Sequence, residues 1–208
     1  MIKCKHKSKW GIIMNNNLIE VMKENNGMIT TKQAKELGFS KMHLKKMLEE
    51  GKIEKVKNGV YLDRNKFGDE YYIFQVRYNN AIFSYNTALY ILGETERTPI
   101  NLDVTVYRGY NAHRFPENIT VHYVKREFLD LGVIERKSPQ GSIVKLYNLE
   151  RTLCDIIRNK NNSLDTEQVN KVTKRLLLGK KVDINLLFEY AEKLKCLEKL
   201  KLIMELII

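Results

Sequence analysis

The stretch from residue 30 to residue 51 constrains the fold most, because helix caps and glycine stops alternate in it at short intervals. Thr30 precedes Gln33 by three residues, which is the spacing of a capping box. A short helix is therefore predicted over residues 31–37, and Gly38 ends it. Ser40 is a favourable N-cap for a second helix, which ends before Gly51. Two short helices joined by a three-residue turn are typical of a helix-turn-helix.

A hairpin is predicted directly after the second helix. Two segments of alternating character, residues 53–57 and 60–62, flank the pair Asn58-Gly59. Asn-Gly between such segments indicates a two-residue turn, which needs positive φ angles. Residues 18–26 have helical periodicity and come before the first cap. The order helix, helix, turn, helix, hairpin predicts a winged helix-turn-helix over residues 17–66, after a basic tail at residues 1–16.

The second helix of this motif has a polar face whose residues suit contact with DNA. Leu44, Met47 and Leu48 share one face by helical spacing, which leaves the other face for solvent or a ligand. Lysines there can reach guanine acceptors or phosphates, and a methionine can contact a thymine methyl group. Free N–H groups at helix starts suit phosphate oxygens, and lysines near the hairpin tip suit the DNA backbone. The candidate DNA-binding residues are Thr31, Ser40, Lys41, Met42, His43, Lys45, Lys46, Lys55, Lys57 and Asn58.

The charge of the chain is concentrated in the same third of the sequence. The 208 residues carry a net charge of +11. Residues 1–65 have 14 cationic and 7 anionic side chains, whereas residues 66–150 have 10 of each and residues 151–208 have 12 and 8. A basic segment beside a neutral one indicates a polyanionic partner, and double-stranded DNA is the simplest one. A solvated basic surface is the alternative that composition alone leaves open.

The remainder, residues 67–208, is predicted to form a mixed α/β domain that ends in a helical bundle. A helix is expected over residues 82–92, strands over 102–107 and 119–124, and a hairpin over 133–147. Four helical stripes follow from residue 149 onwards, the second of them after a capping box at Asp165 and Gln168. In the first of these helices, Arg151 and Asp155 lie outside the apolar stripe at the spacing of a helical ion pair. The overall fold class is therefore α+β.

Three segments of the sequence resemble AbiEi-type antitoxins of bacterial type IV toxin–antitoxin systems, which act in abortive infection by phage. The first runs from Ile29 to Tyr61 and contains ITTKQAKELGFS, GKIEKV and NGVY. The second is SYNTALYILG at residues 84–93, and the third is LERTLCDIIR at residues 149–158. The resemblance covers about residues 17–208, and the basic tail before it departs from the family's compact start. Met1 and Met14 are both candidate start residues.

This resemblance implies a function that the composition does not. It implies that the winged helix binds inverted repeats in its own promoter and represses the operon. It also implies that residues 67–208 supply an antitoxin activity against a nucleotidyltransferase-like toxin, without a stable complex between the two proteins. The alternative is a winged-helix transcription regulator whose second domain senses a ligand or dimerises.

An enzyme is a third hypothesis. Asp103 on one expected strand and Glu135-x-Lys137 on another are the residue types of a metal-dependent nuclease. The segment after Glu135 runs into the turn Ser138–Gly141, which favours an exposed charged hairpin. We therefore expect Asp103 and Glu135 to be separated, with no metal between them and no catalytic function.

Other classes have little support in the sequence. The three cysteines, Cys4, Cys154 and Cys196, have neither a disulfide pattern nor metal-ligand spacing. The sequence contains no glycine-rich phosphate-binding loop, so no cofactor is expected. Apolar runs are only a few residues long, whereas a membrane span needs about 20. No apolar stretch follows the basic start, so a secretory leader is not expected. The expected location is the cytoplasm.

Overall fold

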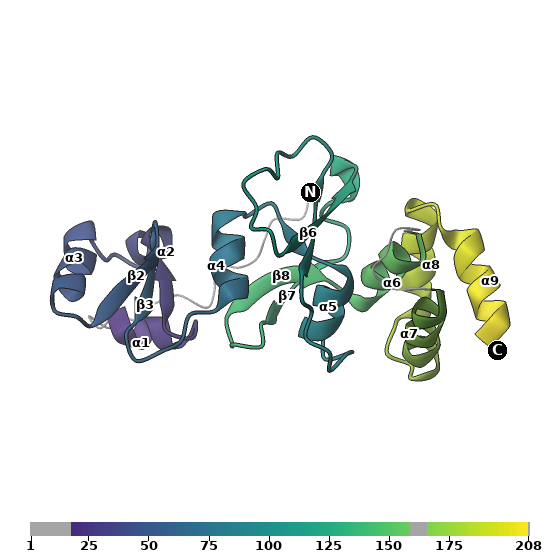
Figure 1. Cartoon of the computed structure of the whole chain (residues 1–208), viewed down its shortest axis with the longest axis horizontal. Coiled ribbons are helices and arrows are strands. Elements are labelled where there is room, and N and C mark those ends of the chain that lie inside the picture. The colour runs from purple at the N-terminus through teal and green to yellow at the C-terminus, as the bar shows by residue number, and fades with distance from the viewer. Residues whose placement is uncertain (1–17, 159–165, 208) are drawn as a thin grey trace. The chain divides into compact units, whose positions relative to one another are not determined.

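The structure is a computed structural model that describes residues 18–158 and 166–207 (Figure 1). The chain divides into two compact units. Unit 1 extends to Ile73 and includes Gln140–Ser142, and unit 2 comprises Phe74–Pro139 and Ile143–Ile208. Helices and strands occur in both units, so the mixed α+β class predicted from the sequence is confirmed.

Unit 1 consists of short helices around a small antiparallel sheet. Its elements are α1 (Leu18–Lys23), β1 (Met28–Thr30), α2 (Thr31–Glu36), α3 (Lys41–Glu49), β2 (Ile53–Lys57) and β3 (Val60–Asp63). The strand order is β1-β3-β2, so β3 lies in the centre. The sequence patterns missed β1, because a strand of three residues is too short to show alternation. It forms because Met28 and Thr30 pair with Leu62 and Val60 across the sheet.

The predicted caps and the hairpin of unit 1 are present, with one difference in the turn. Thr30 and Gln33 form both hydrogen bonds of the capping box. The hairpin turn is Asn58-Gly59, but only Gly59 has a positive φ, of 77°. The turn is therefore not the mirror-image type that requires two positive φ angles. The pairing of β2 with β3 is irregular next to it, with a register shift between Lys55 and Lys57.

Unit 2 is built on a five-stranded mixed sheet. Helix α4 (Glu70–Arg77), which the sequence patterns missed, begins in unit 1 and ends in unit 2. The strands are β4 (Ile82–Phe83), β5 (Leu102–Tyr107), β6 (Ile119–Val124), β7 (Val133–Lys137) and β8 (Ile143–Tyr147), in the order β6-β5-β4-β8-β7. The pairs β5–β6 and β4–β8 are parallel, and the other two pairs are antiparallel.

The helix expected over residues 82–92 is partly wrong, because its first two residues form β4. Helix α5 (Tyr85–Ile91) follows it. Ser84 precedes this helix, but its side chain makes no capping hydrogen bond. Its hydroxyl oxygen instead accepts a hydrogen bond from Thr105 at 2.9 Å. Pairing of Ile82 and Phe83 with β5 therefore overrides the local helical pattern.

The C-terminal part of unit 2 is a cluster of four helices, as predicted. They are α6 (Leu149–Arg158), α7 (Thr166–Leu178), α8 (Ile184–Lys193) and α9 (Leu197–Ile207), and they gather together in Figure 1. Leu153, Leu176, Leu187 and Leu200, one from each helix, are completely buried in one apolar cluster. The capping box expected at Asp165 begins outside the described residues. Between β6 and β7, the 3₁₀ turn η1 (Arg126–Phe128) brings Phe128 against the same cluster.

Within residues 18–158 and 166–207, no helix combines the length and apolar character that crossing a membrane requires.

Candidate nucleic-acid interface

Helix α3 presents one face to the core of unit 1 and the other to solvent. Leu44 and Met47 are buried in a cluster that includes Leu18 from α1 and Ile53 from β2. The hydroxyl of Ser40 caps the helix by accepting a hydrogen bond from the His43 N–H at 3.1 Å. Apolar anchors on one side and a defined N-terminus therefore hold the polar face of α3 in one orientation.

The candidate residues of α3 lie on this outer face. Lys41, Lys45 and Lys46 are exposed, and so is the Met42 side chain, which retains 79% of its accessible surface. His43 is partly buried because its ring packs against Phe39, with ring centroids 5.3 Å apart. A methionine that is so exposed on a short helix contributes no folding energy through burial, so its position is available to a ligand.

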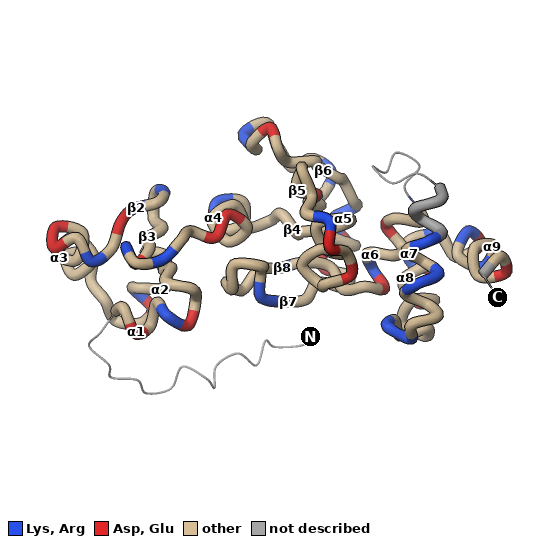
Figure 2. The backbone as a smooth tube through the Cα atoms, turned by 60° about the horizontal axis from the view of Figure 1, so that its bottom comes forward, with Lys and Arg blue, Asp and Glu red and all other residues tan. Residues whose placement is uncertain are grey.

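Charge is distributed unevenly along α3, and Figure 2 shows both signs on this helix. Lys41 lies in its first turn, whereas the helix ends at Glu49 and Glu50. The Glu50 carboxylate accepts a hydrogen bond from Lys52 at 2.8 Å, and this bond lowers the pKa of Glu50. Lysines near a helix N-terminus and glutamates at its C-terminus oppose the helix dipole, at about 0.3–1 kcal/mol each. Lys46, in the last turn, is favourably placed, so Lys41, Glu49 and Glu50 are the charges of α3 that the dipole disfavours.

Exposed ion pairs lie along the second half of α3. Lys45 lies 3.7 Å from Glu49, and Lys46 lies 3.8 Å from Glu50. The lysine side chains of these pairs are about three-quarters exposed, and pairs of this kind contribute at most about 1 kcal/mol. A phosphate group can therefore replace the glutamate as the partner of either lysine at low cost.

The hairpin adds a second group of candidate residues. Lys55, Lys57 and Asn58 are exposed on β2 and at its turn. Thr31 is bound to the same turn, because its N–H donates to the Gly59 carbonyl at 2.9 Å. This N–H is therefore not free for a phosphate, contrary to the expectation for the start of α2. The contact instead fixes the hairpin tip against the helix pair.

The candidate nuclease residues do not come together. Asp103 is on β5 and Glu135 is on β7, with β4 and β8 between them. Three strand spacings of about 4.8 Å put them about 14 Å apart. The Asp103 carboxylate is 2.8 Å from His122 Nε2, and Glu135 is exposed opposite Lys145. The predicted separation is therefore confirmed. Among the described residues, no group of three metal-ligating side chains was found.

The ion pair of α6 forms as the spacing predicts, but it lies in the interior of unit 2 and not at its surface. Arg151 Nε donates to Asp155 Oδ2 at 2.9 Å, and the two side chains are 0% and 1% exposed. Arg151 Nη1 also donates to the carbonyls of Phe128 and Leu131, and its guanidinium lies over the Tyr147 ring at 4.2 Å. The expectation that these residues lie outside the buried face is wrong, because the 126–131 segment covers that side of α6.

One comparison with known proteins bears on this interface. Residues 18–62 match the model of a protein family described as "Transcriptional regulator, AbiEi antitoxin". No curated protein matches the chain. The matched segment begins with α1 and ends within β3, so it contains α3, the hairpin and every candidate DNA-binding residue. Residues 18–62 therefore match, as the sequence motifs indicated, the AbiEi antitoxin family of transcriptional regulators.

Proposed function

We propose that residues 17–66 form a winged helix-turn-helix that binds inverted repeats in the promoter of its own operon and represses transcription. The observation that carries this proposal is the outer face of α3. Exposed Lys41, Lys45 and Lys46 and the exposed Met42 project from a helix that Leu44 anchors in the core. This is the composition of a helix that enters the major groove with its first turns toward the bases.

The charge polarity of α3 supports the same proposal. Features that break a local stability rule tend to lie at functional sites. A phosphate near Lys41 would compensate the unfavourable placement of this lysine at the helix N-terminus. In this arrangement Lys55, Lys57 and Asn58 of the hairpin contact the DNA backbone next to the groove. Ser40 and His43, at the start of α3, lie where such helices meet base edges.

The second part of the proposal concerns residues 67–208. We assign to them the antitoxin activity against a nucleotidyltransferase-like toxin, exerted without a stable complex. The support is the AbiEi family match of the first unit and the resemblance of residues 84–93 and 149–158 to the rest of that family. Because the promoter is the target, repression takes place in the cytoplasm. No catalytic step is assigned to this protein.

Replacing Lys45 and Lys46 together with alanine is expected to weaken binding to the promoter duplex by about tenfold or more. The plot of log affinity against log salt concentration has a negative slope, which becomes shallower by about 0.9 for each phosphate that the variant no longer neutralises. Both lysines are exposed and make only solvent-screened ion pairs, so the variant retains its fold. Fluorescence anisotropy with a labelled promoter fragment, measured at several salt concentrations, gives the affinity and the slope.

The matched control replaces Lys23 and Lys66 with alanine. Both are exposed lysines of unit 1 that lie outside α3 and the hairpin. It removes the same charge, so long-range attraction falls equally in both variants. Loss of affinity in the α3 variant alone supports the assignment. Equal losses in both would show that net charge, and not α3, determines binding, and the assignment would be wrong.

A growth assay tests the antitoxin part. Expression of the full chain is expected to restore growth inhibited by the toxin gene encoded beside it. A fragment of residues 70–208 is expected to retain part of this rescue and to lose operator binding, since it lacks α3. Rescue by the α3 variant at the wild-type level would separate the two activities. A stably expressed full chain that restores no growth would refute the antitoxin assignment.

A further inference from the structure

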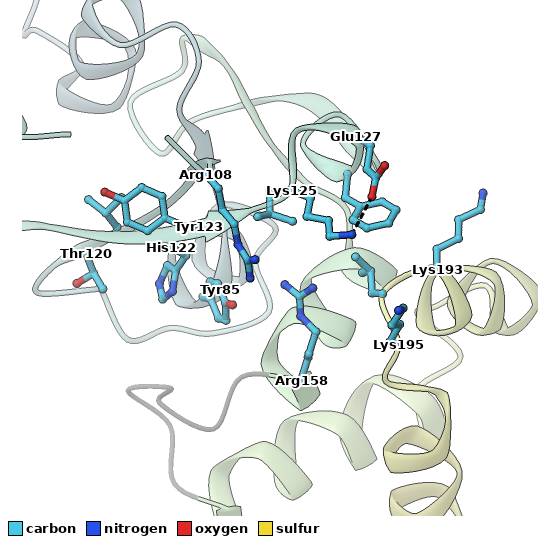
Figure 3. A pocket seen from close by; sticks show the side chains of 14 residues that line it. Tyr85, Arg108, Thr120, His122, Tyr123, Lys125, Glu127, Arg158, Lys193 and Lys195 are labelled. Atoms are coloured by element: carbon cyan, nitrogen blue, oxygen red, sulfur yellow. Dashed lines mark hydrogen bonds and ion pairs between the residues drawn. The ribbon is translucent and has the colours of Figure 1, made fainter. Parts of the chain in front are cut away.

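A hollow of about 710 Å³ lies in unit 2, beside the edge strand β6. Its lining comes from five parts of the chain, and Figure 3 shows the side chains that line it. Strand β6 contributes His122 and Tyr123, the end of α6 contributes Arg158, and the segment after α8 contributes Lys195. The His122 ring is stacked on Tyr85, with centroids 3.8 Å apart. The volume falls in the range of about 300–1,000 Å³ that is usual for small-molecule sites.

The lining is strongly cationic. Among the described residues that line it are five lysines and arginines, and Glu127 is the only acidic one. The five cations are Arg108, Lys125, Arg158, Lys193 and Lys195. Lys125 lies 3.5 Å from Glu127, and Lys193 lies 2.5 Å from Glu189 on its own helix. Two of the five charges are thus paired by neighbouring carboxylates.

The other three charges are not compensated in this way. Arg158 Nη2 is 3.3 Å from Asp155 Oδ1, but that single carboxylate already pairs with the buried Arg151. The side chains of Arg108 and Lys195 make no ion pair with any described residue. Residues 66–150, which contribute Arg108 and Lys125, have equal numbers of cationic and anionic side chains, whereas residues 151–208, which contribute the other three cations, have 12 and 8. The concave surface therefore concentrates positive charge against its own repulsion.

The two arginines identify the kind of anion that fits. Figure 3 shows the guanidinium ends of Arg108 and Arg158 turned toward one another across the hollow. Arginine binds phosphate with two parallel hydrogen bonds, and two guanidinium groups that face each other can hold a chain of phosphates between them. Tyr123, whose side chain is 47% exposed, provides a ring on which a base can stack.

We propose that this hollow of unit 2 binds a nucleoside triphosphate, with its phosphate chain between Arg108 and Arg158 and with Lys195 as a further contact. This site is separate from the DNA-binding residues of unit 1, and the proposal does not depend on them. A duplex would meet a phosphate-binding surface over a longer stretch, and an acidic peptide would offer carboxylates. The size of the hollow favours the small ligand, and the alternatives are outcomes of the test.

Isothermal titration calorimetry with the full chain tests the proposal, with ATP, sodium tripolyphosphate and adenosine as probes in metal-free buffer. Saturable one-site binding of ATP is expected, weaker binding of tripolyphosphate, and no binding of adenosine. Arg108→Ala removes charged hydrogen bonds to phosphate and is expected to weaken ATP binding by about tenfold to a hundredfold. Lys195→Asn gives a smaller loss in the same direction and keeps a residue that tolerates the positive φ of 58°.

Two controls make the test specific. Arg136→Ala removes an exposed arginine on β7, at the opposite edge of the sheet from β6, and is expected to leave ATP binding unchanged. The Lys45→Ala/Lys46→Ala variant is expected to bind ATP normally, because those residues lie in unit 1. Circular dichroism of each variant verifies the fold before titration.

Several results would overturn the proposal. These are the absence of saturable ATP binding at millimolar concentration, equal binding by the Arg108→Ala variant, or adenosine binding as tight as that of ATP. Promoter affinity that falls in the Arg108→Ala variant as far as ATP affinity would assign the cations to nucleic acid instead. Displacement of bound ATP by a polyglutamate peptide at lower concentration than by tripolyphosphate would favour an acidic peptide.

Discussion

Replacing Arg151 with methionine is expected to destabilise unit 2 by about 3–5 kcal/mol, because the change leaves a buried carboxylate without its main partner. Arg151 and Asp155 are almost inaccessible to solvent, and burial already raises the pKa of Asp155, although Arg151 opposes that shift. The carbonyls of Phe128 and Leu131 also lose a donor. Urea unfolding followed by circular dichroism measures the loss.

The pH dependence of this variant has a defined sign. Without Arg151, the folded-state pKa of Asp155 rises further above its unfolded value. The penalty of the charged carboxylate is then present at neutral pH and is relieved as the pH falls through the raised pKa. The deficit relative to the wild type should therefore shrink on acidification. A deficit that grows on acidification, or a variant as stable as the wild type at pH 7, would contradict the account of this pair.

A double variant, Arg151→Met with Asp155→Leu, separates the charge effect from the change in packing. Replacing a buried ion pair with apolar residues of similar size is often neutral, whereas breaking it is costly. We expect the double variant to regain much of the stability that the single one loses. Recovery remains incomplete because Arg158 also contacts Asp155, at 3.3 Å. No recovery would indicate that the arginine acts through its carbonyl contacts alone.

Gly132→Ala is expected to destabilise the same unit by about 2–4 kcal/mol, through strain and close contact together. Gly132 has a φ of 78°, which a residue with a Cβ adopts only at a cost. A Cβ there would lie 2.6 Å from Arg151 Cβ and 2.8 Å from Asn148 Oδ1. Both atoms belong to the start of α6, so the helix must shift. The midpoint of thermal or urea unfolding gives the effect.

Gly109→Ala is the matched control for this prediction. Gly109 has a φ of 92°, but a Cβ there would have no neighbour within 4 Å. This variant contains the backbone strain without the close contact and should lose only about 1 kcal/mol. Equal losses at the two glycines would show that α6 accommodates the extra carbon, and the packing argument at Gly132 would be wrong.

Local signals predicted the regular elements well where the pattern was long. The strands at 102–107 and 119–124 and the helix at 149–158 have the limits that alternation and capping indicated. In unit 1, the capping box of Thr30 and the N-cap Ser40 have the hydrogen bonds that their spacing implies. These features depend on neighbours within a few residues, so they can be inferred without knowledge of the fold.

Elements that depend on distant partners were missed. β1 has three residues and β4 has two, and each exists because a longer strand pairs with it. The cations of the hollow were also not predicted as a group, since Arg108 and Lys195 are separated by 86 intervening residues. No spacing rule connects residues that only the folded chain brings together.

The sequence by itself determined the capped helix pair with its hairpin, the cationic face of α3 and the resemblance to AbiEi antitoxins, because all of these are written in short-range spacing and composition. Only the tertiary structure decided that Arg151 and Asp155 are buried, that two other strands lie between those of Asp103 and Glu135, and that cations from four segments line one hollow. The physical reason is that burial, strand order and electrostatic potential are set by which distant segments pack together, and local preferences do not encode that choice.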